Sequence, residues 1–411
     1  MKVIILNSSD TQGGAARAAY RLHKALLSQD VDSQMLVQNK SSDDLTVLGP
    51  ISKLDSFMSK LRPRLDSIPF RFFKKESSTL FSYSWLPSGR LIKRINELNP
   101  DIVHLHWVNA GMLRIEDIAK INAPIVWSLH DMWPFNGGWH YDEALVTSLQ
   151  KILSDRVLNR KKNTYPKIRN MTVIGLSKWL QTCAYESNIF EGKKIINLPN
   201  PIDSERYKPF NKKDAKELWG LPKNKKLILF GAIGATSDPR KGFKELIDAL
   251  SKLRLNDAAL VVFGSTRPEQ SFDIDCEVHY MGELLDDISL VTLYSAVDVM
   301  VVPSLQENLS NAIMESLSCG TPVVGFAVGG NSDLIEHKQT GYLAKPFDTE
   351  DLARGINFIL NADNYSALSK KARNKVLCEF DSRLVAQKYI GLYERIIAEY
   401  SITHEQSPNE S

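Results

Sequence analysis

Two glutamates eight residues apart have the chemistry to hold a sugar. Glu307 and Glu315 both lie within residues 303–322. A carboxylate can accept two hydrogen bonds from a vicinal diol, and ribose and hexose rings both carry such diols. The pattern predicts that Ser310 caps a helix running to about Ser318, so Glu307 stands on the loop before the helix and Glu315 lies inside it. Taken alone, Glu307 would be read first as an ordinary loop carboxylate.

Two adjacent cations follow a loop of glycines and small residues. Arg240 and Lys241 lie within residues 230–243, between an expected strand and an expected helix. Small residues let the backbone approach a ligand closely, and Arg or Lys side chains neutralise phosphate charge. A turn with an Arg-Lys pair on the surface would produce the same pattern.

Two glycine pairs also lie between an expected strand and an expected helix. They are Gly13-Gly14 and Gly329-Gly330. At such a junction, free backbone N–H groups and the helix dipole face an incoming anion. Each pair alone is a weak indication, because tight strand-to-helix turns need glycine anyway.

Together these motifs resemble glycosyltransferase family 4, a group of retaining enzymes with the GT-B fold. The resemblance covers nearly the whole chain and is densest over residues 226–346. It implies an α/β protein of two facing, doubly wound, Rossmann-like domains with a cleft between them. In such enzymes, Glu307 would contact the hydroxyls of the donor sugar, Glu315 would bind the nucleotide ribose diol, and Lys241 would bind the donor diphosphate.

The resemblance also implies the rest of the site. His130, at the end of an expected strand, would lie near the reacting sugar and would form the catalytic set with Lys241 and Glu307. The donor-binding set would be Gly13, Gly14, Arg240, Lys241, Glu307, Asn308, Leu309, Ser310, Glu315, Gly329 and Gly330. One departure is that the family usually has Gly-Arg where this chain has Gly231-Ala232, which leaves open whether Arg240 replaces that arginine.

Short apolar, β-branched runs recur along the chain, each followed by a helical pattern. Because the runs are continuous rather than alternating, they are typical of parallel strands covered by helices on both faces. The series appears twice, with a proline- and lysine-rich gap near residues 201–225 that reads as a hinge. We therefore expect an acceptor-side domain at 1–205, a donor-binding domain at 206–380, a helix at 381–400 that packs back on the first domain, and a polar tail at 401–411.

Composition narrows the possible partners and the compartment. A net charge of +3 over 411 residues is too small to indicate a nucleic-acid partner. Four scattered cysteines without a CxxC pair indicate neither a disulfide framework nor a zinc site. No apolar run approaches the roughly 18 residues of a membrane span. We expect a cytoplasmic protein that could rest against the inner face of the membrane.

One basic and aromatic segment could make that membrane contact. Residues 58–76 hold Lys60, Arg62, Arg64, Arg71, Lys74 and Lys75, interleaved with Phe70, Phe72 and Phe73. Such a stretch can lie on an anionic lipid surface. An exposed loop with a small core of its own would look the same.

No metal or other cofactor is expected besides the nucleotide sugar, which is a co-substrate. Asp30-x-Asp32 and Asp273-x-Asp275 match the short acidic pattern of metal-dependent transferases, but such patterns are common in solvated loops. His104 and His106 fall at strand spacing and, with His130, could imitate a metal cluster; strand-end packing and substrate contact are favoured. The resemblance implies a front-face reaction that needs no protein base.

The leading hypothesis is a retaining hexosyltransferase that moves a sugar from a nucleotide donor to a carbohydrate or lipid-linked acceptor, in surface polysaccharide biosynthesis. A nucleotide-sugar epimerase of the same fold is an alternative, although the Glu307–Glu315 pattern argues against it. A catalytically inactive sugar-nucleotide-binding module is a second. A P-loop nucleotide hydrolase is disfavoured because no GxxxxGK[ST] segment is present.

Overall fold

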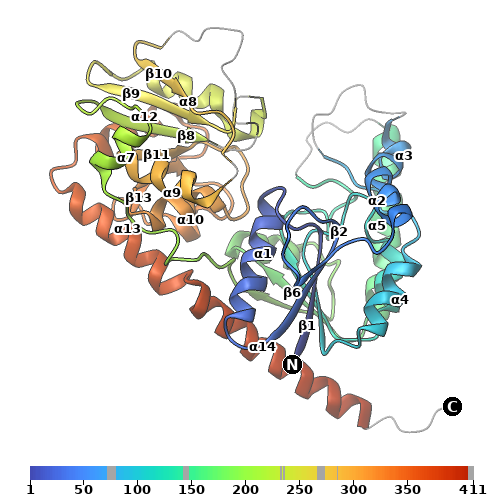
Figure 1. Cartoon of the computed structure of the whole chain (residues 1–411). Helices are drawn as coiled ribbons and strands as arrows, with labels where there is room; N and C mark the ends of the chain where they lie inside the picture. Colours follow the sequence, from blue (N-terminus) through green and yellow to red (C-terminus); the bar gives the residue numbers. More distant parts are fainter. Residues whose placement is uncertain are drawn as a thin grey trace. The chain divides into compact units, whose positions relative to one another are not determined.

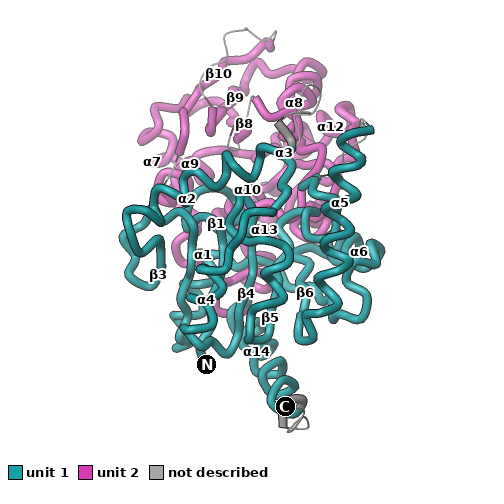
Figure 2. Tube along the Cα trace, turned by 90° about the vertical axis from the view of Figure 1, so that its right-hand side faces the viewer, with its two compact units in different colours: residues 1–201, 385–411 teal, residues 202–384 magenta. Residues whose placement is uncertain are grey.

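The computed structural model describes residues 1–71, 80–141, 148–231, 234, 237–265, 274–284 and 286–405 (Figure 1). The chain forms two compact units, one of residues 1–201 with 385–411 and one of residues 202–384 (Figure 2). We call them unit 1 and unit 2. The last helix, α14 (Ser382–Glu405), begins at the end of unit 2 and continues into unit 1.

Unit 1 is built on a parallel sheet whose described strands follow the order β3-β2-β1-β4-β5-β6-β7. The strands are β1 (Lys2–Ser9), β2 (Asp32–Asn39), β3 (Val47–Leu48), β4 (Ile102–Leu105), β5 (Ile125–Leu129), β6 (Met171–Gly175) and β7 (Lys194–Asn197). The helices are α1 (Gly14–Leu27), α2 (Lys53–Asp66), α3 (Ile68–Arg71), α4 (Gly89–Glu97), α5 (Ser148–Thr164) and α6 (Lys178–Glu186).

Unit 2 is built on a second parallel sheet, with the described order β10-β9-β8-β11-β12-β13. The strands are β8 (Lys226–Gly231), β9 (Ala258–Phe263), β10 (Glu277–Tyr280), β11 (Val299–Val302), β12 (Val323–Phe326) and β13 (Gly341–Ala344). The helices are α7 (Lys212–Leu218), α8 (Phe243–Leu250), α9 (Asp287–Ala296), α10 (Asn311–Ser318), α11 (Asn331–Leu334), α12 (Thr349–Leu360) and α13 (Tyr365–Glu379).

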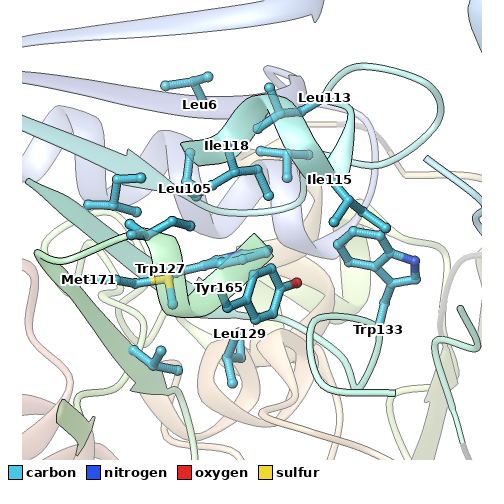
Figure 3. Close-up of a cluster of buried hydrophobic side chains, with 14 of the residues drawn as sticks. Leu6, Leu105, Leu113, Ile115, Ile118, Trp127, Leu129, Trp133, Tyr165 and Met171 are labelled. Carbon is cyan, nitrogen blue, oxygen red and sulfur yellow. The ribbon is translucent and has the colours of Figure 1, made fainter. Parts of the chain in front are cut away.

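The expected two-domain, doubly wound α/β fold is confirmed. Every residue of the central strands β4, β5, β9 and β11 is buried, as continuous apolar runs require when helices cover both faces of a sheet. The core of unit 1 gathers around Trp127, Trp133 and Tyr165 (Figure 3), where the rings of Trp127 and Tyr165 meet edge to face with centroids 5.6 Å apart.

The strand order of each sheet predicts the edge at which a ligand would bind. In unit 1 the connections reverse direction between β1 and β4, and in unit 2 between β8 and β11. At such a switch point the loops leaving two neighbouring strands turn to opposite faces of the sheet and open a crevice at the carboxyl ends. The loops after β8 and β11, and those after β1 and β4, therefore carry the groups most able to meet a ligand.

Two segments differ from expectation. Residues 202–225 form part of unit 2 rather than a hinge: Ile202, Tyr207 and Ala215 are completely buried there, and α7 forms within the stretch. The prolines that suggested a linker lie beside buried residues: Pro201 precedes Ile202, Pro209 lies two residues after Tyr207, and Pro222 follows the buried Leu221. Helix α14 runs five residues beyond the expected end at 400, because no helix-breaking residue occurs before Pro408.

Helix α14 packs its tyrosines against the sheet of unit 1. Tyr393 is fully buried and its hydroxyl lies 2.7 Å from Nδ1 of His104, while the hydroxyl of Tyr389 lies 3.5 Å from Oγ of Ser128. Among the described residues, no helix combines the length and the apolar character that crossing a bilayer demands.

Candidate active site

Three loops of unit 2 are joined at the carboxyl ends of β8, β11 and β12. The backbone N–H of Leu305 donates to the carbonyl of Arg240 at 2.8 Å, which joins the loop after β11 to the loop after β8. The N–H of Gly330 donates to the carbonyl of Glu307 at 3.2 Å, which joins the loops after β11 and β12. These bonds bring the glycine pair, the cations and the first glutamate to one edge of the sheet.

At this edge Lys241 and Glu307 form an ion pair. The Nζ of Lys241 lies 3.0 Å from Oε2 of Glu307, and the Ser304 hydroxyl approaches the same oxygen at 3.4 Å. The Lys241 and Glu307 side chains keep 26% and 17% of their exposure, so both are largely desolvated yet reachable. A cation and a carboxylate thus share one position at the sheet edge.

A glycine is required directly after Lys241. Gly242 has φ of +73°, and a Cβ built on it would lie 1.9 Å from the carbonyl oxygen of Pro303. Only a residue without a side chain lets the two loops approach so closely. This explains the Lys-Gly pair: the glycine holds Lys241 against the loop that carries Glu307.

Replacing Gly242 with alanine should lower the free energy of unfolding by about 3 kcal/mol, since the new methyl group meets a backbone oxygen in a strained conformation. Urea unfolding would measure it. Gly220→Ala is the matched control: Gly220 has a similar φ of +62°, but a Cβ added there would meet nothing within 4 Å, so only the backbone cost of about 1 kcal/mol should appear. Equal losses in the two variants would contradict the close-approach argument.

Arg240 is engaged by a neighbouring acid. Its Nε and Nη2 lie 3.1 and 2.6 Å from the two carboxylate oxygens of Asp238. Burial alone would raise the pKa of Asp238, but the guanidinium of Arg240 and the backbone bond that Asp238 accepts hold that pKa below its usual value. Arg240, like Lys241, is therefore paired with a carboxylate at this edge.

The helix that carries Glu315 forms as predicted. The Ser310 hydroxyl accepts the N–H of Ile313, α10 ends at Ser318, and Gly320 takes φ of +76° after the helix. Glu315 is buried with 3% exposure, and its Oε2 accepts a hydrogen bond from the Tyr294 hydroxyl at 3.0 Å. The apolar helix turns this face into the unit, so the carboxylate needs a polar partner there.

The remaining donor-binding candidates of unit 2 lie beside this pair. Gly329 has φ of +52° and Gly330 caps α11. Asn308 is half-buried, whereas Leu309 and Ser310 are buried, so Leu309 acts as a packing anchor for the loop. The structure therefore brings together Arg240, Lys241, Glu307, Asn308, Ser310, Gly329 and Gly330 at one sheet edge, with Glu315 one helical turn behind.

Gly13, Gly14 and His130 belong to unit 1. Gly13 caps α1 with φ of +95°, a backbone conformation that disfavours any side chain, and Gly14 is the first residue of the helix. His130 follows β5 directly and stays partly exposed. These residues occupy the carboxyl edge of the unit 1 sheet, next to its own switch point.

His130 is bonded to a second histidine. Its Nε2 lies 2.8 Å from Nδ1 of His106, the residue that follows β4, and the ring of His104 packs on His106 with centroids 4.3 Å apart. Burial lowers the pKa of His130 to about 4 and that of His104 to about 3; for His106, burial and then the two neighbouring imidazoles lower the pKa further below its ordinary value. All three rings are neutral at pH 7.

The loop after His130 is held by a separate polar group. The Asp131 carboxylate accepts the N–H of Trp133 at 2.9 Å and the indole N–H of Trp107 at 2.8 Å, and it lies 2.6 Å from Nδ1 of His140. Burial would raise the pKa of Asp131, but His140 and these donors keep it below the usual value. Asp131 therefore stays ionised as an anchor of the loop.

The acidic and histidine patterns do not assemble a metal cage in the described part of the chain. No group of three or more His, Cys, Asp or Glu side chains there is placed to hold an ion. Asp30 and Asp32 are exposed on either side of the buried Val31, at the turn into β2. Asp273 lies outside the described residues, as do Ala232 and residues 72–76 of the basic segment.

Sequence reasoning missed four contributors to these sites: Asp238, Tyr294, Ser304 and His106 as a partner of His130. Asp238 and Ser304 had a local signal, since each lies within three residues of the group it contacts. His106 could have been found because it and His130 each follow neighbouring strands by one residue. Tyr294 comes from another helix, and nothing in the local pattern indicates its contact with Glu315.

Two doubly wound parallel units with charged and glycine-rich strand ends have the architecture of GT-B glycosyltransferases. Residues 12–206 match the family described as Glycosyltransferase Family 4, and residues 225–362 match Glycosyl transferases group 1. The chain belongs to this family and is a glycosyltransferase that uses nucleotide sugars.

Known proteins agree with this assignment. The phosphatidyl-myo-inositol mannosyltransferase of Mycobacterium tuberculosis strain H37Rv is 25% identical over 308 residues, covering 72% of this chain and 74% of that protein. Sucrose-phosphate synthase from Thermosynechococcus elongatus superposes with a TM-score of 0.69 at 20% identity, over 97% and 99% of the two chains. Anabaena HepE, solved in complex with UDP and glucose, gives a TM-score of 0.66 at 18% identity, over 96% and 99%.

Proposed function

We propose that this protein transfers a hexose from a nucleotide-sugar donor to a carbohydrate or lipid-linked acceptor with retention of the anomeric configuration, in the synthesis of a surface polysaccharide. The observation that carries the proposal is the Lys241–Glu307 pair at 3.0 Å on the switch-point edge of unit 2. Lys241 binds the donor diphosphate, Glu307 the hydroxyls of the donor sugar, and Glu315 the ribose diol. His130 contacts the sugar that is transferred.

The chemistry assigned to this edge is stabilisation of a leaving group. As the bond from the anomeric carbon to the diphosphate oxygen breaks, negative charge grows on that oxygen. Lys241 supplies the compensating charge, with the N–H of Gly329 as a further donor because the N–H of Gly330 is bonded to the Glu307 carbonyl, so no metal is required. The acceptor oxygen bonds to the anomeric carbon on the face that the diphosphate leaves, and the leaving phosphate oxygen takes the acceptor proton.

Two other functions would use the same binding site. An epimerase would change the donor sugar without an acceptor, and an inactive module would bind the nucleotide and do nothing further. The transferase is favoured because Lys241, Glu307, Glu315 and His130 are all present, and because Lys241 and Glu307 lie close enough for one ligand to reach both.

The test is to supply UDP-, GDP-, ADP- and CMP-sugars with glycan and lipid-linked acceptors, and to measure nucleotide release with and without EDTA. We expect one donor to release its nucleotide only when an acceptor is present, at a rate that EDTA does not change. NMR of the product should show the anomeric configuration of the donor. Acceptor-independent conversion of the donor sugar would establish the epimerase, and binding without turnover the inactive module.

We further propose that the protein works at the inner face of a membrane, where α2 contacts anionic lipid. Leu54, Phe57 and Met58 lie on one face of α2 and are 61%, 62% and 37% exposed. The spacing of Lys53, Lys60 and Arg64 puts three exposed cations along one edge of that face. The Arg62 side chain is not part of this surface, because it donates to the carbonyls of Gly111, Leu86 and Pro87.

Removing two of these cations, Lys60→Ala with Arg64→Ala, should weaken binding to vesicles containing phosphatidylserine by about 30-fold, since each cation near an anionic surface contributes about 1 kcal/mol. Vesicle co-sedimentation would measure it. Lys151→Ala with Lys162→Ala, which removes two exposed cations from α5, is the control and should change nothing. An identical bound fraction for the two double variants would rule out α2 as the contact.

A further inference from the structure

We propose that His106 is a positioning residue that fixes the tautomer of His130, so that His130 meets the transferred sugar as a neutral hydrogen-bond donor through Nδ1. The inference rests on the proposed function for the role of His130, and on the geometry of unit 1 for everything else. His106 lies outside the family motif, and it determines which hydrogen bonds His130 can make.

The unpaired Nε2 of His106 determines which ring nitrogen carries the proton of this residue. Its side chain is 3% exposed, and its Nε2 is buried without a hydrogen-bond partner in the described residues. A buried N–H without an acceptor is rarer and costs more free energy than a buried ring nitrogen without a donor. Nε2 is therefore the unprotonated nitrogen. A neutral imidazole has one N–H, which then belongs to Nδ1.

The proton position on His106 determines the proton position on His130. Nδ1 of His106 lies 2.8 Å from Nε2 of His130, and a hydrogen bond needs one donor and one acceptor. Because His106 donates, Nε2 of His130 accepts and carries no proton. The single proton of the neutral His130 ring therefore lies on Nδ1. Within the described residues Nδ1 has no partner, and His130 is partly exposed.

His106 is held in place by its contact with His104. Its ring packs on His104, whose Nδ1 lies 2.7 Å from the Tyr393 hydroxyl and whose Nε2 lies 2.8 Å from Oγ of Ser128. His104 and His106 project from β4 to one face of the sheet, and Ser128 and His130 project from β5 to the same face. The result is two parallel cross-strand pairs, His104–Ser128 and His106–His130. The first pair orders the His104 ring, on which His106 packs.

The consequence for the reaction is specific. With Nε2 occupied by His106 and Nδ1 protonated, His130 has no lone pair free to take a proton from an acceptor. It can donate one hydrogen bond to a sugar oxygen. This agrees with a reaction in which the leaving phosphate oxygen, and not a protein side chain, receives the acceptor proton.

The test combines a spectroscopic and a kinetic measurement on the full chain. Nitrogen-15 NMR of the imidazoles at pH 7 should show both His106 and His130 protonated on Nδ1. In His106→Asn the amide nitrogen replaces Nδ1 and can still donate to His130. In His106→Gln the amide reaches the Nε2 position and the donor is lost. We expect His106→Gln to lower kcat about 10- to 100-fold and to move the His130 proton toward Nε2, with His106→Asn restoring most of both.

Ser33→Ala is the control, since it removes the bond that Ser33 shares with the buried His23 and leaves the contacts of His104, His106 and His130 in place. It should keep the His130 tautomer and kcat. The proposal is overturned if wild-type His130 is protonated on Nε2, if His106→Gln keeps the wild-type tautomer, or if Asn and Gln variants lose activity equally, as a purely structural role would require. If wild type transfers no sugar, the proposed function fails, while the NMR result still decides the tautomer.

Discussion

Lys241→Ala should lower kcat by about 100- to 1,000-fold, because the diphosphate then departs with its developing charge uncompensated. That is the size of effect seen when one preorganised donor is removed from a charged transition state. The same variant leaves Glu307 without its cation, 3.0 Å away in the wild type, and so adds a repulsive carboxylate beside the phosphates. We expect kcat and kcat/KM to fall together, since the interaction strengthens as the bond breaks.

The structure offers a close control for this variant. Lys244 is exposed on α8, three residues further along the chain, and Lys244→Ala should leave turnover unchanged. Folding should be little affected in either variant, because a partly exposed ion pair contributes about 1 kcal/mol or less to stability. Turnover of Lys241→Ala within threefold of wild type would remove Lys241 from the reaction and with it the leaving-group argument.

Unit 1 should lose stability steeply between pH 6.5 and about 4. Burial lowers the pKa of His23 and of His130 to about 4 and that of His104 to about 3, and lowers the pKa of His106 as well. In this window an unfolded chain binds protons that the folded chain does not, so the free energy of unfolding falls as the pH falls. Each such histidine contributes a slope of about 1.4 kcal/mol per pH unit.

Tryptophan fluorescence isolates this transition, since six of the seven tryptophans lie in residues 1–201: Trp85, Trp107, Trp127, Trp133, Trp139 and Trp179. Urea unfolding followed by fluorescence from pH 7 to 4.5 should show the loss. His23→Gln should reduce the slope by about one proton, because His23 is buried between Ser33 and Thr46. His337→Gln, on the surface of unit 2, is the control. A stability that is flat over this range would contradict the buried, neutral histidines.

Patterns along the chain were enough for the parts of the fold that depend on local chemistry. The continuous apolar runs identified the central strands, and a serine followed by an apolar helix and a glycine identified the limits of α10. The exception was β3, whose two residues are too few to form a pattern. Residues 201–225 were misread because their prolines and lysines are visible in the sequence, whereas the burial of Ile202 and Tyr207 against unit 2 is not.

Contacts between different helices, strands and loops could not be predicted from the sequence. The motif predicted Glu307, Glu315 and Lys241 as members of one site, and the strand order explains why their loops adjoin. It did not predict that Tyr294 would hold Glu315 inside the unit, or that Asp238 would occupy Arg240. These partners lie on other elements or around a turn, where only the folded backbone determines which side chains meet.

If unit 2 binds a nucleoside diphosphate through Glu315, calorimetric titration should detect that binding. UDP, GDP and ADP would be titrated into wild type, into Glu315→Gln, which can still accept the Tyr294 bond, and into Glu350→Gln, an exposed acid on α12. We predict that one nucleotide binds wild type and the Glu350 variant equally, and binds Glu315→Gln about 10- to 100-fold more weakly, the loss expected for charge-assisted hydrogen bonds. Equal affinity for all three proteins, or no binding by wild type, would contradict the account.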